Sequence, residues 1–209
     1  MTALLVSLSI AAQTLALDAE KATPGYRPDT AEADQFVRSA KSATIAVYPV
    51  VIREKVAGTS YNTESQKAAI LKLHDAGIRQ TIAVATQLDT KELQGDTQWK
   101  LFQAGLASFG KQIDEAKLAA DYAIIVELLM DPRPVDAWTL FGVHCYVLDA
   151  SGKNAFSFLL NSHHQLFVNS DLTTRDLSEA GRQALTTKTV HVAIDALNQQ
   201  MERARAETK

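Results

Sequence analysis

The sequence predicts an α/β fold: a three-layer sandwich built on a five-stranded mixed sheet, with a parallel centre and an antiparallel edge hairpin. Three short segments are apolar at both odd and even positions, which indicates strands covered on both faces: residues 43–52, 81–86 and 122–130. Helical patterns separate these runs, and residues 138–167 then read as a long two-stranded hairpin followed by a final helix. The expected element order is βαβαββα, with the strands arranged 2-1-3-4-5 in the sheet.

The amino terminus predicts export. Residues 3–17 carry no charge, and this apolar segment suits the core of a secretory signal, whereas a spanning helix needs about 20 residues. Ala16 and Ala19 are small enough for cleavage nearby, so residues 1–19 are predicted to be a signal peptide. A buried or amphipathic first helix is the alternative. No cysteine lies near residue 20, which argues against a lipid anchor and favours a periplasmic or secreted protein.

A linker and a short helix are expected over residues 20–42, because two prolines and a glycine precede a helical pattern at 30–41. A single α/β domain is expected over residues 43–209. Pro49 cannot donate a backbone hydrogen bond, so it should interrupt pairing within the first strand.

The first linking helix is predicted over residues 63–76. Thr63 and Gln66 have the spacing of a capping box, and Gly77 suits a left-handed cap at the carboxyl end.

Two longer helices are predicted further along the chain. The first covers residues 97–118, with Gly105 and Gly110 as candidate break points. The last covers residues 174–204, where apolar residues recur at spacings of three and four and predict one face packed against the sheet.

A single pairing register separates the residues of both hairpin strands into an apolar face and a more polar face. If residues 150–153 form the turn, Asp149 pairs with Asn154 and His144 pairs with Leu159. One face is then entirely apolar; it consists of Phe141, Val143, Cys145, Val147, Phe156, Phe158 and Leu160. The other face carries His144, Tyr146, Ser157, Asn161 and His163 among leucines. Cys145 should therefore lie in the core, and the histidines should occupy separate surface or edge positions.

The residues contain no catalytic or cofactor signature. A net charge of −3 and a pI near 5.9 argue against nucleic acid as a partner. The single cysteine, Cys145, excludes an intramolecular disulfide and a multi-cysteine metal site. Neither a nucleophile elbow nor a glycine-rich phosphate loop is present. His144, His163 and His164 are not expected to converge on one metal ion, so no metal or cofactor is expected.

Three features remain as candidates for chemistry or recognition. Glu127 lies inside the most apolar strand and should be ion-paired or reach the sheet end, with a functional acid as the alternative. Arg133, between two prolines, and Trp138 suggest a recognition loop, because Arg and Trp often anchor interfaces; a plain connector is the alternative. His191 and Asp195 are one helical turn apart and suggest a solvent-side pair.

Two short motifs carry a family resemblance. Ala120-Asp121-Tyr122 before the third strand and residues 149–153 (DASGK) at the turn resemble the ADY and D-x-x-x-G patterns of a periplasmic α/β domain. That domain is shared by the lipoprotein activators of penicillin-binding proteins, the curli secretion lipoprotein and the amino-terminal domain of the Tol-system propeller protein. The resemblance covers residues 43–205 at the level of pattern. It implies a non-enzymatic partner-binding or assembly role in the cell envelope. Membrane tethering is not expected to carry over, because this sequence departs from that family in lacking the lipid-anchor cysteine.

We therefore expect an exported, non-enzymatic interaction or assembly module, with Arg133 and Trp138 as candidate partner-binding residues. The expected partner is an envelope protein; nucleic acid and a membrane anchor are not expected, and a homo-oligomer stays open. The alternative is a small-ligand-binding or hydrolytic protein with a cleft at the carboxyl ends of the parallel strands. Glu127, Asp131 and the loop at 87–96 would line that cleft.

Overall fold

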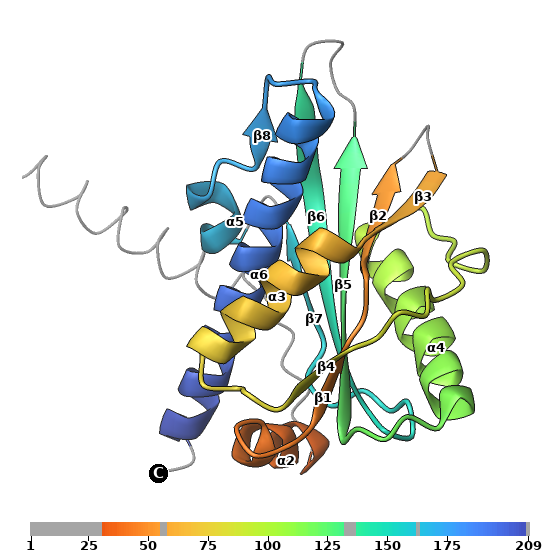
Figure 1. The fold of residues 1–209 in the computed structure, drawn as a ribbon, viewed down its shortest axis with the longest axis vertical. Coiled ribbons are helices and arrows are strands. Elements are labelled where there is room, and N and C mark those ends of the chain that lie inside the picture. The colour runs from red at the N-terminus through yellow and green to blue at the C-terminus, as the bar shows by residue number, and fades with distance from the viewer. Residues whose placement is uncertain (1–30, 55–57, 132–136, 162–163, 208–209) are drawn as a thin grey trace, which may run out of the picture.

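The computed structural model describes residues 31–54, 58–131, 137–161 and 164–207, and the predicted α/β class is confirmed in them. The expected leader, 1–19, lies outside these residues. The described chain forms an open mixed sheet of eight strands and five helices (Figure 1). The strands are β1 (Ile45–Val47), β2 (Val50–Glu54), β3 (Gly58–Asn62), β4 (Thr81–Ala83), β5 (Tyr122–Asp131), β6 (Trp138–Asp149), β7 (Phe158–Asn161) and β8 (Thr173–Thr174). The helices are α2 (Ala31–Ser39), α3 (Thr63–Asp75), α4 (Gln98–Ala116), α5 (Gln165–Asn169) and α6 (Glu179–Glu207).

Strand β5 lies at the centre of the sheet. It is parallel to β1 and β2 on one side and antiparallel to β6 on the other. β4 continues the sheet parallel to β1, and β3 continues it antiparallel to β2. β7 and β8 both pair antiparallel with β6. The carboxyl ends of β2 and β5 therefore lie at one end of the sheet, beside the start of β6.

The sheet has eight strands rather than the five predicted, and particular residues explain the difference. Pro49 interrupts the first predicted strand, which becomes β1 and β2 with Tyr48 and Pro49 between them. Residues 58–62, which lie between the first predicted strand and the first predicted helix, form β3 because their backbone pairs with β2. Residues 173–174 add the short strand β8, and the last helix begins at Glu179 rather than at residue 174 as predicted.

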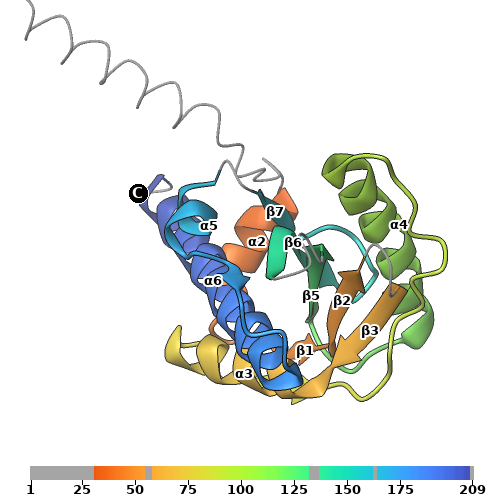
Figure 2. The ribbon, with the colours of Figure 1, turned by 90° about the horizontal axis from the view of Figure 1, so that it is seen from above.

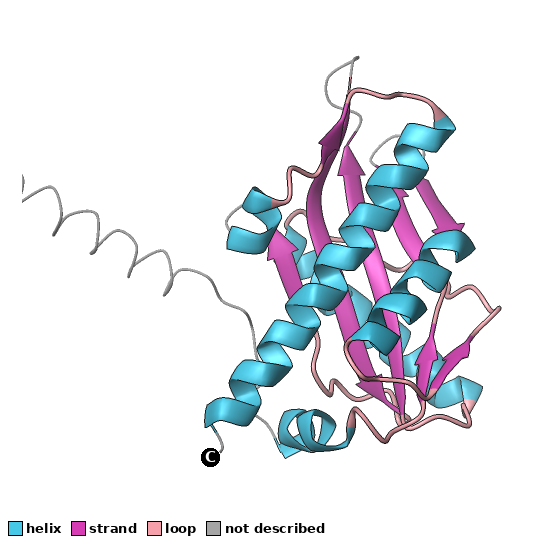
Figure 3. Ribbon diagram, turned by 60° about the vertical axis from the view of Figure 1, so that its left-hand side comes forward, coloured by secondary structure: helices cyan, strands magenta, loops and turns pink. Residues whose placement is uncertain are grey.

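Helices cover both faces of the sheet and create two cores (Figures 2 and 3). On one face, α2, α3 and α6 pack over apolar residues of the central strands. On the other face, α4 contributes Phe102, Phe109 and Ile113 to a smaller core. Helix α2 belongs to the first core, because Phe36 is fully buried and its ring contacts Tyr122.

The predicted hairpin register is confirmed along β7, where His144 pairs with Leu159 and Cys145 with Phe158. Cys145 is fully buried, as predicted. The register differs at both ends. Near the turn Asn154 pairs with Leu148 rather than with Asp149. At the other end, a bulge in the β5–β6 ladder between residues 129 and 130 leaves residue 141 without a partner there, so Leu140 rather than Phe141 joins the first core.

The prediction that His144 is a surface or edge residue was wrong. His144 is 0% exposed, because α4 covers this face of the hairpin. The ring of Phe102 contacts both His144 and Tyr146, and Phe109 contacts Tyr146 from the next turns of α4. Both faces of β6 are therefore interior.

The start of α3 also differs from its prediction. Asn62 is the N-cap, with its side chain accepting a hydrogen bond from the Ser65 amide at 2.8 Å. The capping box predicted from Thr63 and Gln66 does not form, because Gln66 is buried and donates to two backbone carbonyls, of Val47 at the end of β1 and of the residue after β4. The left-handed conformation predicted for Gly77 is confirmed by its φ of 85°.

The glycines of α4 do not break the helix; they allow it to approach the sheet closely. A Cβ on Gly105 would lie 2.1 Å from the Tyr146 hydroxyl. A Cβ on Gly110 would lie 2.4 Å from the carbonyl oxygen of Gly152 in the hairpin turn. Side chains at these positions would therefore push α4 away from β6.

On α6 the predicted pair of His191 and Asp195 is replaced by a contact between helices. Asp195 forms an ion pair with Lys72 of α3 at 3.0 Å. None of the described helices is both long enough and apolar enough to cross a membrane.

Candidate functional site

A hollow of about 320 Å³ lies at the carboxyl ends of β2 and β5, between the first turn of α6 and the edge strand β3. Figure 1 shows this end of the sheet opposite α2. We call it the Trp138 hollow. Its lining residues are Glu54, Gly58, Thr59, Ser60, Trp138, Glu179 and Arg182.

Arg182 joins the two sides of the Trp138 hollow. Its Nη2 donates to a carboxylate oxygen of Glu54 and to the Ser60 hydroxyl, the latter at 3.2 Å. Its Nη1 faces Glu179 at 3.5 Å. The guanidinium carbon lies 5.8 Å from the centre of the Trp138 ring, within the range of a cation–π contact. The side chain therefore links α6 to β2, β3 and β6 at once.

Two residues that line the Trp138 hollow each carry an N–H group that has no acceptor among the described residues. Trp138 Nε1 and Arg182 Nε are both buried, and neither has a hydrogen-bond partner in the described part of the chain. A buried donor left unpaired costs about 1–3 kcal/mol, so such groups in a native protein call for an explanation. An acceptor supplied by a bound partner is one such explanation.

The hollow contains one of the two predicted recognition residues. Trp138 lies in its wall, half-buried, whereas Arg133 lies outside the described residues. Sequence reasoning missed Arg182 and Glu54. They are 128 positions apart, and only the packing of α6 across the sheet brings them together.

A second polar cluster, the Glu127 network, lies inside the sheet under α4. Glu127 and His144 are cross-strand partners, and the carboxylate is 0% exposed. Its Oε2 accepts hydrogen bonds from His144 Nδ1 and from the Tyr146 hydroxyl, both at 2.8 Å. Its Oε1 accepts from Arg53 Nη1 at 3.3 Å. Because a carboxylate only accepts, the Nδ1 atom of His144 is the donor in this contact and carries a proton.

These contacts shift the pKa values in opposite directions. Burial by itself raises the pKa of Glu127, but hydrogen bonding and charge at His144, the Tyr146 hydroxyl and the Arg53 charge together hold that pKa below its ordinary value. Burial, together with the adjacent carboxylate, raises the pKa of the Tyr146 phenol well above its ordinary value. The network is thus an ionised, ion-paired acid, as predicted for Glu127.

The Glu127 network is closed to solvent. Arg53 Nη2 donates to the carbonyl of Leu93 at 2.9 Å, and Leu93 itself is buried. The segment that precedes α4 therefore covers the carboxylate. The Glu127 side chain has no exposed surface. The side chain of Asp131 lies outside the described set. The alternative prediction of a cleft lined by Glu127 stays a prediction.

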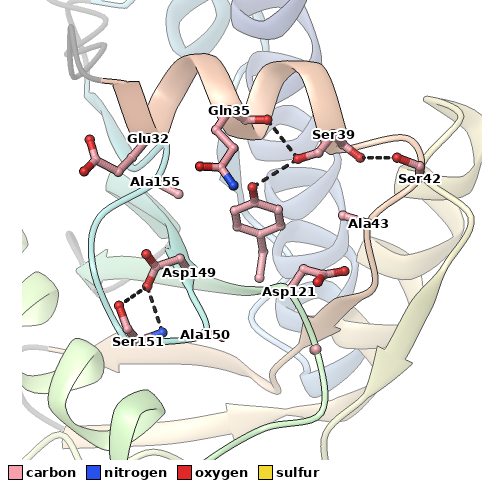
Figure 4. A pocket seen from close by; sticks show the side chains of 12 residues that line it. Glu32, Gln35, Ser39, Ser42, Ala43, Asp121, Asp149, Ala150, Ser151 and Ala155 are labelled. Atoms are coloured by element: carbon pink, nitrogen blue, oxygen red, sulfur yellow. Dashed lines mark hydrogen bonds between the residues drawn. The ribbon is translucent and has the colours of Figure 1, made fainter.

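A larger hollow, of about 510 Å³, lies at the opposite end of the sheet beneath α2 (Figure 4). It brings together the two motifs that carry the family resemblance, because Tyr122 pairs with Asp149 across β5 and β6. Its lining residues are Glu32, Gln35, Ser39, Ser42, Ala43, Ala120, Asp121, Tyr122, Asp149, Ala150, Ser151 and Ala155.

The motif residues in this second hollow have local structural partners. Asp121 accepts a hydrogen bond from the Thr44 amide at 2.7 Å, which fixes the entry to β1. Asp149 accepts from the amide and hydroxyl of Ser151 and from the Lys153 amide, which closes the turn. Because these carboxylates already have partners, we favour the Trp138 hollow as the candidate functional site.

The remaining reactive side chains have structural surroundings. Burial raises the pKa of the Cys145 thiol to about 12, so the reactive thiolate is suppressed. His164 caps α5 by accepting from the Leu166 amide, and burial, with a smaller effect of the nearby Arg203 charge, lowers its pKa. Within the described residues, no three His, Cys, Asp or Glu side chains are grouped so that they could hold a metal ion.

Fold and site together define an α/β domain with a polar, aromatic hollow at the end of its sheet. No family model matches the chain, and no curated protein matches it. Two solved structures of the PelC dodecamer from Paraburkholderia phytofirmans are similar to it. One, a single-substitution variant, has a TM-score of 0.39 and 15% identity over 76% of this chain and 90% of that chain. The other has a TM-score of 0.36 and 16% identity over 73% and 88%.

At this level of similarity, the PelC structures support no inference about function or assembly. They do not bear on the resemblance to the periplasmic α/β domain either, which stays a prediction.

Proposed function

We propose that this protein is an exported, non-enzymatic interaction module of the cell envelope that binds a partner protein at the Trp138 hollow. One observation carries the proposal: Trp138 and Arg182 line a surface hollow, and each carries a buried N–H group, Nε1 and Nε respectively, with no acceptor in the described chain. A partner that brings an oxygen acceptor to these two side chains would satisfy the donors once the side chains turn toward it.

The chemistry of the wall supports this site. Trp and Arg are enriched among residues that dominate binding energy at protein interfaces. Here they form a half-buried pair: ion pairs with Glu54 and Glu179 hold Arg182, and its guanidinium lies against the Trp138 ring. Little side-chain entropy of Arg182 therefore remains to be lost on binding. Trp138, the first residue of β6, is also one of the two residues that the sequence suggested for recognition.

Site-specific photocrosslinking tests the proposal. A photoreactive phenylalanine analogue in place of Thr59, on the rim of the hollow, should crosslink an envelope protein, whereas the same analogue in place of Lys111 on α4 should not. Trp138→Ala should reduce the Thr59 crosslink at least tenfold. Trp99→Ala is the matched control, because Trp99 is the other tryptophan of the chain and lies on α4.

Two results would overturn the proposal. One is an equal yield of crosslinked partner from positions 59 and 111. The other is an unchanged yield in Trp138→Ala, once urea unfolding has shown that this variant is folded. Export is tested separately by mass spectrometry of the native amino terminus, where we expect cleavage near Ala16 or Ala19. An intact residue 1–19 segment would contradict export.

A further inference from the structure

The edge strand β3 offers an unpaired backbone beside the Trp138 hollow. β3 pairs with β2 over five residue pairs, from Val50–Asn62 to Glu54–Gly58, and with no other described strand. In an antiparallel ladder, alternate residues direct their N–H and C=O groups away from the partner strand. No backbone hydrogen bond of the described chain outside its helices and strands involves residues 58–62.

β3 also lacks the features that protect sheet edges. Its sequence, GTSYN, contains no charged residue and no proline, although natural edge strands commonly use both to prevent pairing with another chain. At the opposite end of the main strand order, β4 is only three residues long. β3, seen at the margin of the sheet in Figure 1, is therefore the better template for an added strand.

The charges of the hollow restrict what can be added. The hollow is lined by two carboxylates, of Glu54 and Glu179, and by one guanidinium, of Arg182, so its charge is negative overall. Glu54 is already paired with Arg182 and is largely buried, whereas the side chain of Glu179 is 78% exposed. A basic side chain that enters the hollow would pair with Glu179, and an acidic one would be repelled.

Building on the proposed function, we infer that the partner binds as an extended peptide segment that adds to the free edge of β3. Its backbone pairs with the free edge of β3, and a Lys or Arg side chain enters the Trp138 hollow opposite Glu179. Strand addition of this kind takes its affinity from main-chain hydrogen bonds and its specificity from alternate side chains.

Short peptides test this inference directly. The probes are acetyl-Val-Lys-Val-Lys-Val-Lys-amide, its Glu counterpart, and two versions of the Lys peptide that are N-methylated at odd or at even residues. The Trp99→Phe variant leaves Trp138 as the remaining tryptophan, so its fluorescence reports binding at the hollow. Hydrogen exchange of the amides of residues 58–62 reports strand addition.

We expect the Lys peptide to bind at least tenfold more tightly than the Glu peptide and to slow exchange in β3. One N-methylated version should lose at least tenfold in affinity and the other should bind normally, because an added strand pairs through alternate amides only. Glu179→Gln should remove most of the preference for Lys over Glu, whereas Glu64→Gln, the same change at another exposed glutamate, on α3, should not.

Any of three results would overturn the inference. Equal binding of both N-methylated peptides excludes an added strand, and equal or tighter binding of the Glu peptide excludes the basic side chain. Absence of binding by all the peptides rejects the extended partner. If crosslinking at Thr59 still depends on Trp138 in that case, the proposed interaction site stands and only this account of the partner fails.

Discussion

Replacing Glu127 by Gln should destabilise the protein substantially although it changes only one atom. The carboxylate is fully buried and receives three hydrogen bonds, from His144, Tyr146 and Arg53. Hydrogen bonds to a charged group contribute about 1.5–3 kcal/mol each and neutral ones about 0.5–1.5 kcal/mol. The bonds from His144 and Tyr146 each weaken by about 1 kcal/mol, and losing the Arg53 ion pair adds up to about 1 kcal/mol.

We therefore expect Glu127→Gln to lower the free energy of unfolding at pH 7 by about 2–3 kcal/mol, or Tm by roughly 4–12 °C for a domain of this size. Urea unfolding followed by circular dichroism measures the change. Glu64→Gln is the matched control, because Glu64 forms an exposed pair with Lys67, and we expect its effect to stay below about 0.5 kcal/mol. Equal effects of the two substitutions would refute a stabilising role for the buried network.

The same pair of proteins gives a pH test. The folded-state pKa of Glu127 lies below its ordinary value of 4.5, so its contribution is fully present above that value and is lost as the pH falls through the folded-state pKa. The stability gap between the wild-type protein and Glu127→Gln should therefore be constant from pH 7 to about pH 5 and shrink at lower pH. A gap that stays constant down to pH 3 would show that folding does not lower the pKa of Glu127.

Three further predictions follow from the packing. Gly105→Ala should destabilise the protein by about 1–2 kcal/mol in urea unfolding, because the clash with Tyr146 outweighs the gain of about 1 kcal/mol in helix propensity; a stabilised variant would contradict this close approach. Asp121→Ala should lower the free energy of unfolding by about 1–2 kcal/mol, because the Thr44 amide loses its acceptor, and Asp121→Asn, which keeps an acceptor, should restore most of that stability. If Asp121→Asn restores nothing, the lost stability does not come from this hydrogen bond. Cys145 should react with iodoacetamide only as fast as the protein unfolds, so rapid labelling under native conditions would disprove its burial.

The hairpin shows what the sequence can predict. The pairing of Cys145 with Phe158 was predictable because one register alone gives both strands an apolar face, and burial of that face enforces the register. The same argument failed for His144, because its face carries polar residues that look solvent-exposed. Their burial depends on Phe102 of α4, and nothing in the local pattern shows that this helix covers them.

The candidate site was predictable only in part. Trp138 and the buried Glu127 stood out individually, since each is an unusual residue for its surroundings. Their partners did not, because the Glu127–His144 pair requires the β5–β6 register, which includes a bulge. The contact of Arg182 with Trp138 likewise requires α6 to cross the end of the sheet. Such long-range contacts are set by tertiary packing rather than by local sequence.

The backbone contact between Gly110 and Gly152 has a practical consequence for anyone who wishes to label this protein. Hairpin turns are usually chosen for epitope tags or fluorescent reporters, because loop tips tolerate insertions. Here the turn is pressed against a helix with no room for even one methyl group, so an insertion at 150–153 would detach α4 and expose the Glu127 network to water.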